Sequence, residues 1–216
     1  MDMKKYGLQA FGLSLFGLSL LALSGCGAVN NVINSVIPEV DNLVKLNGTT
    51  VDATVGSGRA VISGNVSKSA EFGDTELPQV SQLRTMRLRQ SLDTAIQVTM
   101  PSGTSLPASF SLSNIALRIR LSDSDTRATE ASATFSGPVT YTRDGTTSTY
   151  RTTTPVEVAN ITFSNTTFST ARDIITTAPS PNTASGRLSF DTDDTQLPNG
   201  TVLRFTFVNG KAKVEL

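Results

Sequence analysis

Short segments of strand character recur from Thr49 onward, separated by turn residues about every ten positions. In residues 115–121, isoleucine and leucine alternate with Ala116, Arg118 and Arg120, which is typical of a strand with one buried face. The predicted strands are 49–55, 59–66, 82–90, 95–100, 108–121, 130–136, 138–143, 146–152, 156–163, 166–176, 186–190, 201–208 and 211–216. Because no helical pattern separates them, they predict a mainly β fold: one antiparallel β-sandwich, with an open β-barrel as the alternative.

The hydroxyl content agrees with this prediction. The 216 residues include 25 Ser and 30 Thr, and threonine favours strands while serine favours turns. Asp144-Gly145 and Asn209-Gly210 each lie between two predicted strands and have the composition of two-residue type I′ turns. We therefore expect a β-hairpin at each of these positions, and an irregular loop over residues 177–186.

A helical pattern precedes the predicted sheet. Valine and isoleucine at positions 29, 32, 33, 36, 37 and 40 follow helical spacing. Pro38 is expected to end this helix or to open a second one that carries Leu43 and Val44, before a stop at Asn47-Gly48. The apolar stripe would lie on a membrane or pack on the β domain. Its polar face lacks a fringe of Lys or Arg, which favours packing on the domain.

The first residues have the pattern of a targeting segment. Lys4 and Lys5 precede an apolar run of 16 residues (8 to 23), shorter than the roughly 20 that span a bilayer. The run ends in Leu23-Ser24-Gly25-Cys26, and here the chain resembles bacterial lipoproteins, whose lipobox has an aliphatic residue, two small residues and a cysteine. The alternatives are an ordinary secreted protein with a chance cysteine and an uncleaved membrane helix.

The resemblance implies a specific processing. Residues 1–25 would be a signal peptide removed before Cys26, which would carry diacylglycerol, with a further acyl chain on the new amino terminus. Gly27, in place of the aspartate that retains such proteins in the inner membrane, favours the outer membrane if the source has two membranes. The expected organisation is then a tether with a short helix over 26–48 and a β-sandwich domain over 49–216, lipid-anchored in the cell envelope.

The composition excludes several kinds of chemistry. With no histidine and one cysteine, the chain cannot form a Ser-His-Asp triad or an internal disulfide, and a zinc site would need carboxylates almost alone. The formal net charge is zero, and Phe110 is the only aromatic residue between positions 73 and 134, so nucleic-acid binding is not supported. No nucleophile elbow, phosphate loop or other catalytic motif is present, and we expect no enzymatic activity.

Two acidic segments suggest a calcium site. They are Asp123-Ser124-Asp125 and the segment that contains Asp191, Asp193 and Asp194. Several carboxylates in one loop suit a hard cation, but neither segment has the spacing of an EF-hand. Arg127 occupies the third ligand position of the first segment and would repel a cation. Turn formation by aspartate is the simpler interpretation, and a Ca²⁺ site is a weaker hypothesis, mostly for the second segment.

Arginines form the other candidate site. Arg87 and Arg89 lie on one face of a predicted strand, as do Arg118 and Arg120 on another. If those strands are neighbours, four guanidinium groups form a patch suited to phosphate or carboxylate, such as an envelope glycan or a lipid headgroup. The alternative is a solvated strand face on which arginine protects a sheet edge.

These observations favour a non-enzymatic, lipid-anchored domain with a binding or structural role in the cell envelope. Its partners would be the membrane, through the lipid, and an envelope protein, glycan or headgroup, with no cofactor except the possible Ca²⁺. A carrier with an internal cavity for lipid or glycan is the alternative, and a carboxylate-based hydrolase is a third. A transmembrane β-barrel is disfavoured because only 13 residues are Phe or Tyr and most predicted strands are short.

Overall fold

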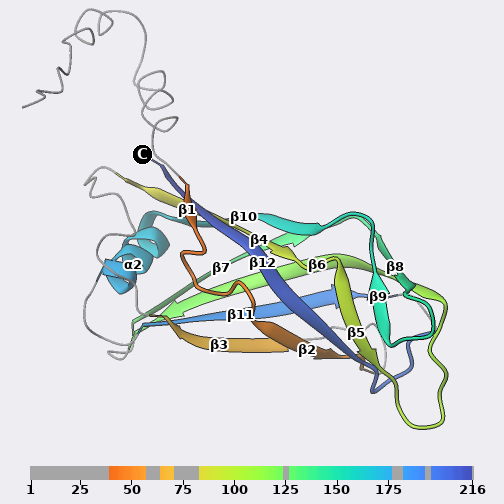
Figure 1. Ribbon diagram of the computed structural model, residues 1–216. Helices are drawn as coiled ribbons and strands as arrows, with labels where there is room; N and C mark the ends of the chain where they lie inside the picture. The colour runs from red at the N-terminus through yellow and green to blue at the C-terminus, as the bar shows by residue number, and fades with distance from the viewer. Residues whose placement is uncertain are drawn as a thin grey trace, which may run out of the picture.

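The computed structural model describes residues 39–56, 64–70, 83–123, 127–176, 182–192 and 196–215. It confirms the mainly β fold, a β-sandwich built from one large antiparallel sheet (Figure 1). The strands are β1 (Val40–Asp41), β2 (Thr50–Thr54), β3 (Gly64–Ala70), β4 (Thr85–Leu92), β5 (Ala95–Thr99), β6 (Ser109–Ser122), β7 (Ala128–Phe135), β8 (Val139–Arg143), β9 (Thr149–Arg151), β10 (Val156–Ser164), β11 (Asn182–Asp191) and β12 (Val202–Glu215). A helix, α2 (Asn165–Thr176), lies between β10 and β11.

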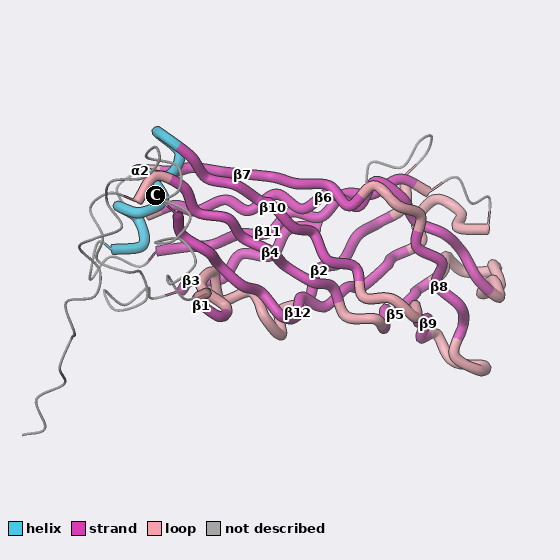
Figure 2. The backbone as a smooth tube through the Cα atoms, turned by 90° about the horizontal axis from the view of Figure 1, so that it is seen from above, coloured by secondary structure: helices cyan, strands magenta, loops and turns pink. Residues whose placement is uncertain are grey.

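Two long strands hold the layers together. The main strand order is β10-β4-β12-β5-β9-β8-β6-β11-β3, with β1 and β2 also paired to β12, and β7 to β6. The first half of β12 pairs with β2 and β5, whereas its second half pairs with β1 and β4. Likewise, β6 pairs first with β8 and then with β7 and β11. Each long strand therefore belongs to two layers, and the strands run along an elongated body (Figure 2).

The sheet does not close into a barrel. Strands β7 and β10 lie side by side, but no ladder joins them within the described part of the chain. Helix α2 packs against both strands at one end of this seam (Figure 1).

The strand predicted over 166–176 is wrong, because these residues belong to helix α2. Its buried residues are Phe168, Ala171, Ile174 and Ile175, a spacing that places them on one helical face. Thr167 helps to begin the helix, because its hydroxyl accepts from the Ser164 amide at 2.9 Å and donates to the Ser164 carbonyl. At the other end, the buried Asn182 side chain donates to the Ile174 carbonyl. Packing of this apolar face outweighs the strand preference of the threonines and isoleucines.

Only one of the two predicted hairpins forms. Strands β8 and β9 pair around Asp144-Gly145, as expected, although the connection runs over residues 144–148. Residues 201–208 and 211–216 were predicted as two strands, but β12 is continuous through Asn209-Gly210. There Asn209 has a φ of 51° and the pairing to β4 shifts between Val208 and Lys211. The same residue types that suit a tight turn here form a β-bulge that bends the strand.

The predicted alternation in β6 is confirmed. Ile115, Leu117, Ile119 and Leu121 are fully buried, whereas Arg118 and Arg120 are exposed. The core also contains large aromatic side chains in mutual contact: the Phe110 ring lies 5.6 Å from that of Tyr141 and 5.0 Å from that of Tyr150. The predicted loop over 177–186 is partly strand, because β11 begins at Asn182, while residues 177–181 lie outside the described residues.

The described part of the expected tether packs on the sheet. Residues 42–44 form a turn after β1 in place of the predicted second helix, and Asn42 and Lys45 adopt positive φ. Leu43, Val44 and Leu46 are buried in the common core. The first predicted helix, over 29–37, and Cys26 lie outside the described residues. In the part of the chain that the structure describes, no helix is long and apolar enough to cross a membrane.

Candidate anion-binding surface

The four predicted arginines lie on two separate strands that do not pair. Arg87 and Arg89 belong to β4, whose neighbours are β10 and β12, whereas Arg118 and Arg120 belong to β6, whose neighbours are β7, β8 and β11. The prediction of one four-guanidinium patch on adjacent strands is therefore wrong. Each arginine pair instead lies beside other basic residues, which the sequence did not indicate.

Two lysines of β12 complete the first group. Lys211 pairs directly with Arg89 and Lys213 with Arg87, and the alternating residues Ala212 and Val214 are buried. These four residues, here called the basic block, thus form a two-by-two arrangement on the outer face of β4 and β12. The bulge in β12 sets this register, which is why the block could not be predicted while 201–216 was interpreted as a hairpin.

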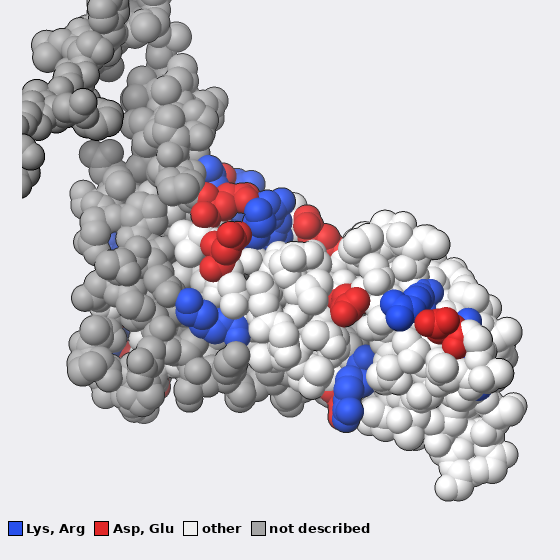
Figure 3. All heavy atoms as spheres, viewed as in Figure 1, with Lys and Arg blue, Asp and Glu red and all other residues white. Residues whose placement is uncertain are grey.

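A shallow groove runs over the basic block. It encloses about 220 Å³ and, besides the block, is lined by Glu39, Leu88, Glu157, Ala159, Asn160 and Glu215. The groove thus extends from Glu39, directly before β1, across β12 and β4 to β10, whose pairing with β4 shifts between Val158 and Ile161. Acidic and basic side chains gather on the visible surface near the end where β1, β4 and β12 meet (Figure 3).

Acidic residues at the edge of the block partly neutralise it. The Glu39 carboxylate lies 2.7 Å from Arg89 Nη2 and 3.6 Å from Lys211 Nζ. Glu215 lies 3.0 Å from Arg87 Nε, and Asp41 3.8 Å from Lys211 Nζ. Because the Arg87, Arg89 and Glu39 side chains are 38–52% exposed, each such pair contributes at most about 1 kcal/mol, and an external anion can replace it.

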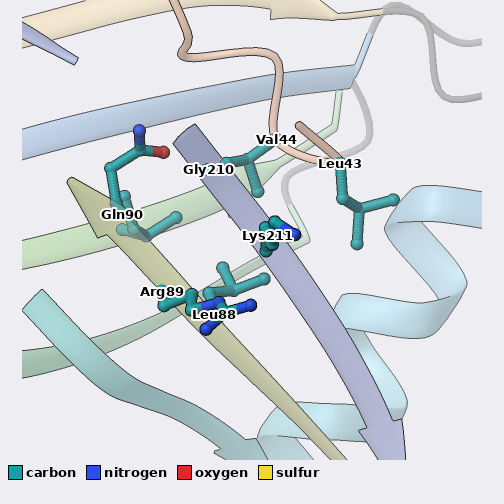
Figure 4. Close-up of a pocket in the computed structure, with 8 residues that line it drawn as sticks. Leu43, Val44, Leu88, Arg89, Gln90, Gly210 and Lys211 are labelled. Carbon is teal, nitrogen blue, oxygen red and sulfur yellow. The ribbon is translucent and has the colours of Figure 1, made fainter. Parts of the chain in front are cut away.

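A buried polar contact supports the block from below. Gln90 is 2% exposed, and its Nε2 donates to Asn47 Oδ1 at 3.0 Å and to the Val208 carbonyl at 2.8 Å. Gly210 also donates to Asn47 Oδ1. A gap of about 10 Å³ lies beside this contact, lined by both Arg89 and Lys211 and by apolar residues including Leu43 and Val44 (Figure 4). The block therefore has a hydrogen-bonded base formed by three distant segments.

The second arginine pair has its own neighbour. Arg118 pairs across β6 and β11 with Arg187, and its guanidinium lies 3.3 Å from the Glu130 carboxylate. All of these side chains are exposed. The groove and the gap beside Gln90 are lined by other residues. The basic block is therefore the candidate site.

The described residues of the two acidic segments make hydrogen bonds within the chain. Asp191 accepts from Asn114 Nδ2 at 2.8 Å, while Asp193 and Asp194 lie outside the described residues. Asp123 accepts from both the backbone and the side chain of Arg127. No cluster of three or more potential metal ligands occurs within the described ranges. The calcium hypothesis stays a prediction.

The pKa of the Asp52 carboxyl group is lower than its ordinary value. A bidentate hydrogen bond from Arg204 holds the pKa of Asp52 below its usual value, with burial opposing this and the charge of Arg204 adding to it. A carboxylic acid that donates a proton at neutral pH needs the opposite shift.

Comparison of the sequence with protein-family models and with curated proteins finds no match.

Proposed function

We propose that this chain is a lipid-anchored, non-enzymatic domain of the cell envelope that binds its partner through the groove over the basic block. Cys26 would carry the lipid after removal of residues 1–25. The lipobox sequence supports this proposal, since its four positions match and follow a basic and an apolar segment in the usual order.

The position of Glu39 is the observation that carries the proposal. Glu39 directly precedes β1, and its carboxylate contacts both Arg89 and Lys211. Only 39 − 26 = 13 residues separate it from Cys26, so the connecting chain spans at most about 45 Å. The groove thus begins where the chain arrives from the anchor.

Among the described residues, the packing of the interior supports binding at the surface in preference to carriage in a cavity. Aromatic side chains such as Phe190 and Phe205, with ring centroids 5.6 Å apart, fill the space between the layers. The gap beside Gln90, about 10 Å³, has room for one water molecule. A lipid or glycan carrier needs several hundred Å³.

Replacing Cys26 with alanine tests the anchor. The variant is expected to incorporate no labelled fatty acid and to leave the membrane fraction, because two or three acyl chains supply most of the membrane affinity. Gly25→Ala is the matched control, since alanine is also small and the lipobox is retained. Unchanged fatty-acid labelling of Cys26→Ala would overturn the proposal.

A further inference from the structure

The basic block places like charges opposite one another. Cross-strand pairing places Lys211 opposite Arg89 and Lys213 opposite Arg87, and like charges directly opposite one another destabilise a sheet. Two consecutive pairs of this kind in one groove are a local arrangement that the zero net charge of the chain does not reveal. Glu39, Asp41 and Glu215 offset part of this repulsion through exposed ion pairs, and an external anion that bridges the two strands would take their place.

Glu39 shows where an anionic oxygen lies in this groove. Its Oε2 lies between the Arg89 guanidinium and the Lys211 ammonium group, at 2.7 and 3.6 Å. A phosphate group offers several oxygens of this kind, and arginine and lysine are its usual ligands. Because Glu39 is 38% exposed, its carboxylate can yield this place to a phosphate at little cost.

The path of the chain indicates the source of that phosphate. If the chain is anchored at Cys26, as proposed above, Glu39 is held within about 45 Å of the bilayer surface. The groove that starts at Glu39 is then within reach of the lipid headgroups. Basic residues near an anionic bilayer surface are attracted to it.

We propose that the basic block binds the phosphates of anionic phospholipid headgroups in the membrane that holds the anchor. This inference rests on the proposed lipid anchor. The bound headgroups orient the domain with the groove toward the membrane and the β8–β9 turn, at the other end of the elongated body, away from it (Figure 1). Glu39 competes with the headgroup for Arg89 and Lys211.

Fluorescence quenching in vesicles tests this orientation. The full protein, purified from membranes, would carry a single fluorophore at Thr162→Cys, which pairs with Arg87, or at Thr146→Cys in the exposed β8–β9 turn. It is inserted into phosphatidylcholine vesicles with or without phosphatidylglycerol, and the quencher is attached to lipid headgroups. We expect phosphatidylglycerol to increase quenching at position 162 and not at position 146, and salt to reverse this increase.

Charge variants locate the effect. Lys211→Gln with Lys213→Gln is expected to shift the equilibrium from the docked to the free orientation by roughly tenfold or more, from the loss of two cations. Arg118→Gln with Arg120→Gln removes the same charge from β6 and is expected to leave quenching unchanged. Glu39→Gln should increase quenching, whereas Glu130→Gln, which removes a carboxylate from Arg118, should not.

The outcomes separate this inference from the anchor proposal. If the protein does not associate with phosphatidylcholine vesicles and the fluorophore also labels Cys26, the anchor proposal fails. If it associates but quenching at position 162 is the same in both vesicle types, the headgroup inference is overturned. In that case, protection of Lys211 and Lys213 from acetylation by inorganic phosphate alone would indicate that the site binds a free oxyanion and not a lipid headgroup.

Discussion

The backbone amide of Gly210 donates to Oδ1 of Asn47 at 2.8 Å, a hydrogen bond between residues 163 positions apart. The same oxygen accepts from Gln90, and the Gly210 carbonyl accepts from the Asn42 amide at 2.7 Å. The loop after β1, the bulge of β12 and strand β4 are thereby joined directly beneath the candidate site.

A methyl group at Gly210 is expected to disrupt this contact. A Cβ built there lies 2.5 Å from Gln90 Oε1 and 3.0 Å from Asn47 Oδ1, and both side chains are held by hydrogen bonds. Gly210→Ala should lower the free energy of unfolding by about 1–3 kcal/mol, measured by urea denaturation. Gly56→Ala is the control, because a Cβ there meets nothing within 4 Å. Equal stability of the two variants would contradict the packing described here.

Helix α2 is expected to contribute through its buried face. Phe168 is 3% exposed, so Phe168→Ala should cost about 3–5 kcal/mol of unfolding free energy. Thr166 is exposed in the first turn, and Thr166→Ala should be neutral or slightly stabilising, because alanine has the higher helix propensity. Residues two apart share one face of a strand, so a stability loss at both positions would instead indicate a strand that buries this face.

The two buried tyrosines are expected to differ. The Tyr141 hydroxyl has no partner among the described residues, and burial raises the pKa of its phenol far above the ordinary value. Tyr141→Phe should be neutral or stabilising. The Tyr150 hydroxyl donates to the Pro107 carbonyl at 2.6 Å, so Tyr150→Phe should cost about 1 kcal/mol. Thermal unfolding of the two variants compares them, and the reverse order of stability would refute this assignment.

The Asp52–Arg204 pair is expected to give stability a small acid dependence. Because the hydrogen bond from Arg204 lowers the pKa of Asp52, folding favours the ionised form. The resulting stabilisation is present above the pKa of Asp52 in the unfolded chain and is lost as the pH falls through its folded pKa. Asp52→Asn should therefore reduce stability at neutral pH and lose its difference from the wild type in acid. Arg204→Gln should reproduce this profile in urea denaturation across the same pH range.

The sequence of helix α2 contains a helical pattern, but the strand preference of its threonines outweighed that pattern in the prediction. The spacing of Phe168, Ala171, Ile174 and Ile175 fits a helix, yet threonines at four of the flanking positions favoured a strand in the prediction. Propensity differs between these alternatives by only fractions of a kcal/mol per residue, whereas burial of one phenylalanine contributes more than that. Packing against β7 and β10 therefore decides the structure.

At the candidate site, the sequence did not predict which strands are neighbours. The sequence placed Arg87 with Arg89, and Arg118 with Arg120, on common strand faces, and both relationships are present in the structure. It did not indicate which strands would be neighbours. Lys211 and Lys213 join Arg87 and Arg89 because β12 bends at Asn209-Gly210 and continues beside β4. Asn-Gly allows either a hairpin turn or a bulge, and only the partner strand selects between them.

By itself, then, the sequence determined the mainly β fold and the buried and exposed faces of individual strands, while the lipid anchor at Cys26 stays a prediction. These are local properties, since side chains alternate with a period of two whatever strand lies alongside. The tertiary structure decided the order of the strands, the helix after β10 and the composition of the basic block. Each of these depends on contacts between residues far apart in the chain, such as Asn47 with Gly210. Their energies exceed the small local preferences that a sequence pattern reports.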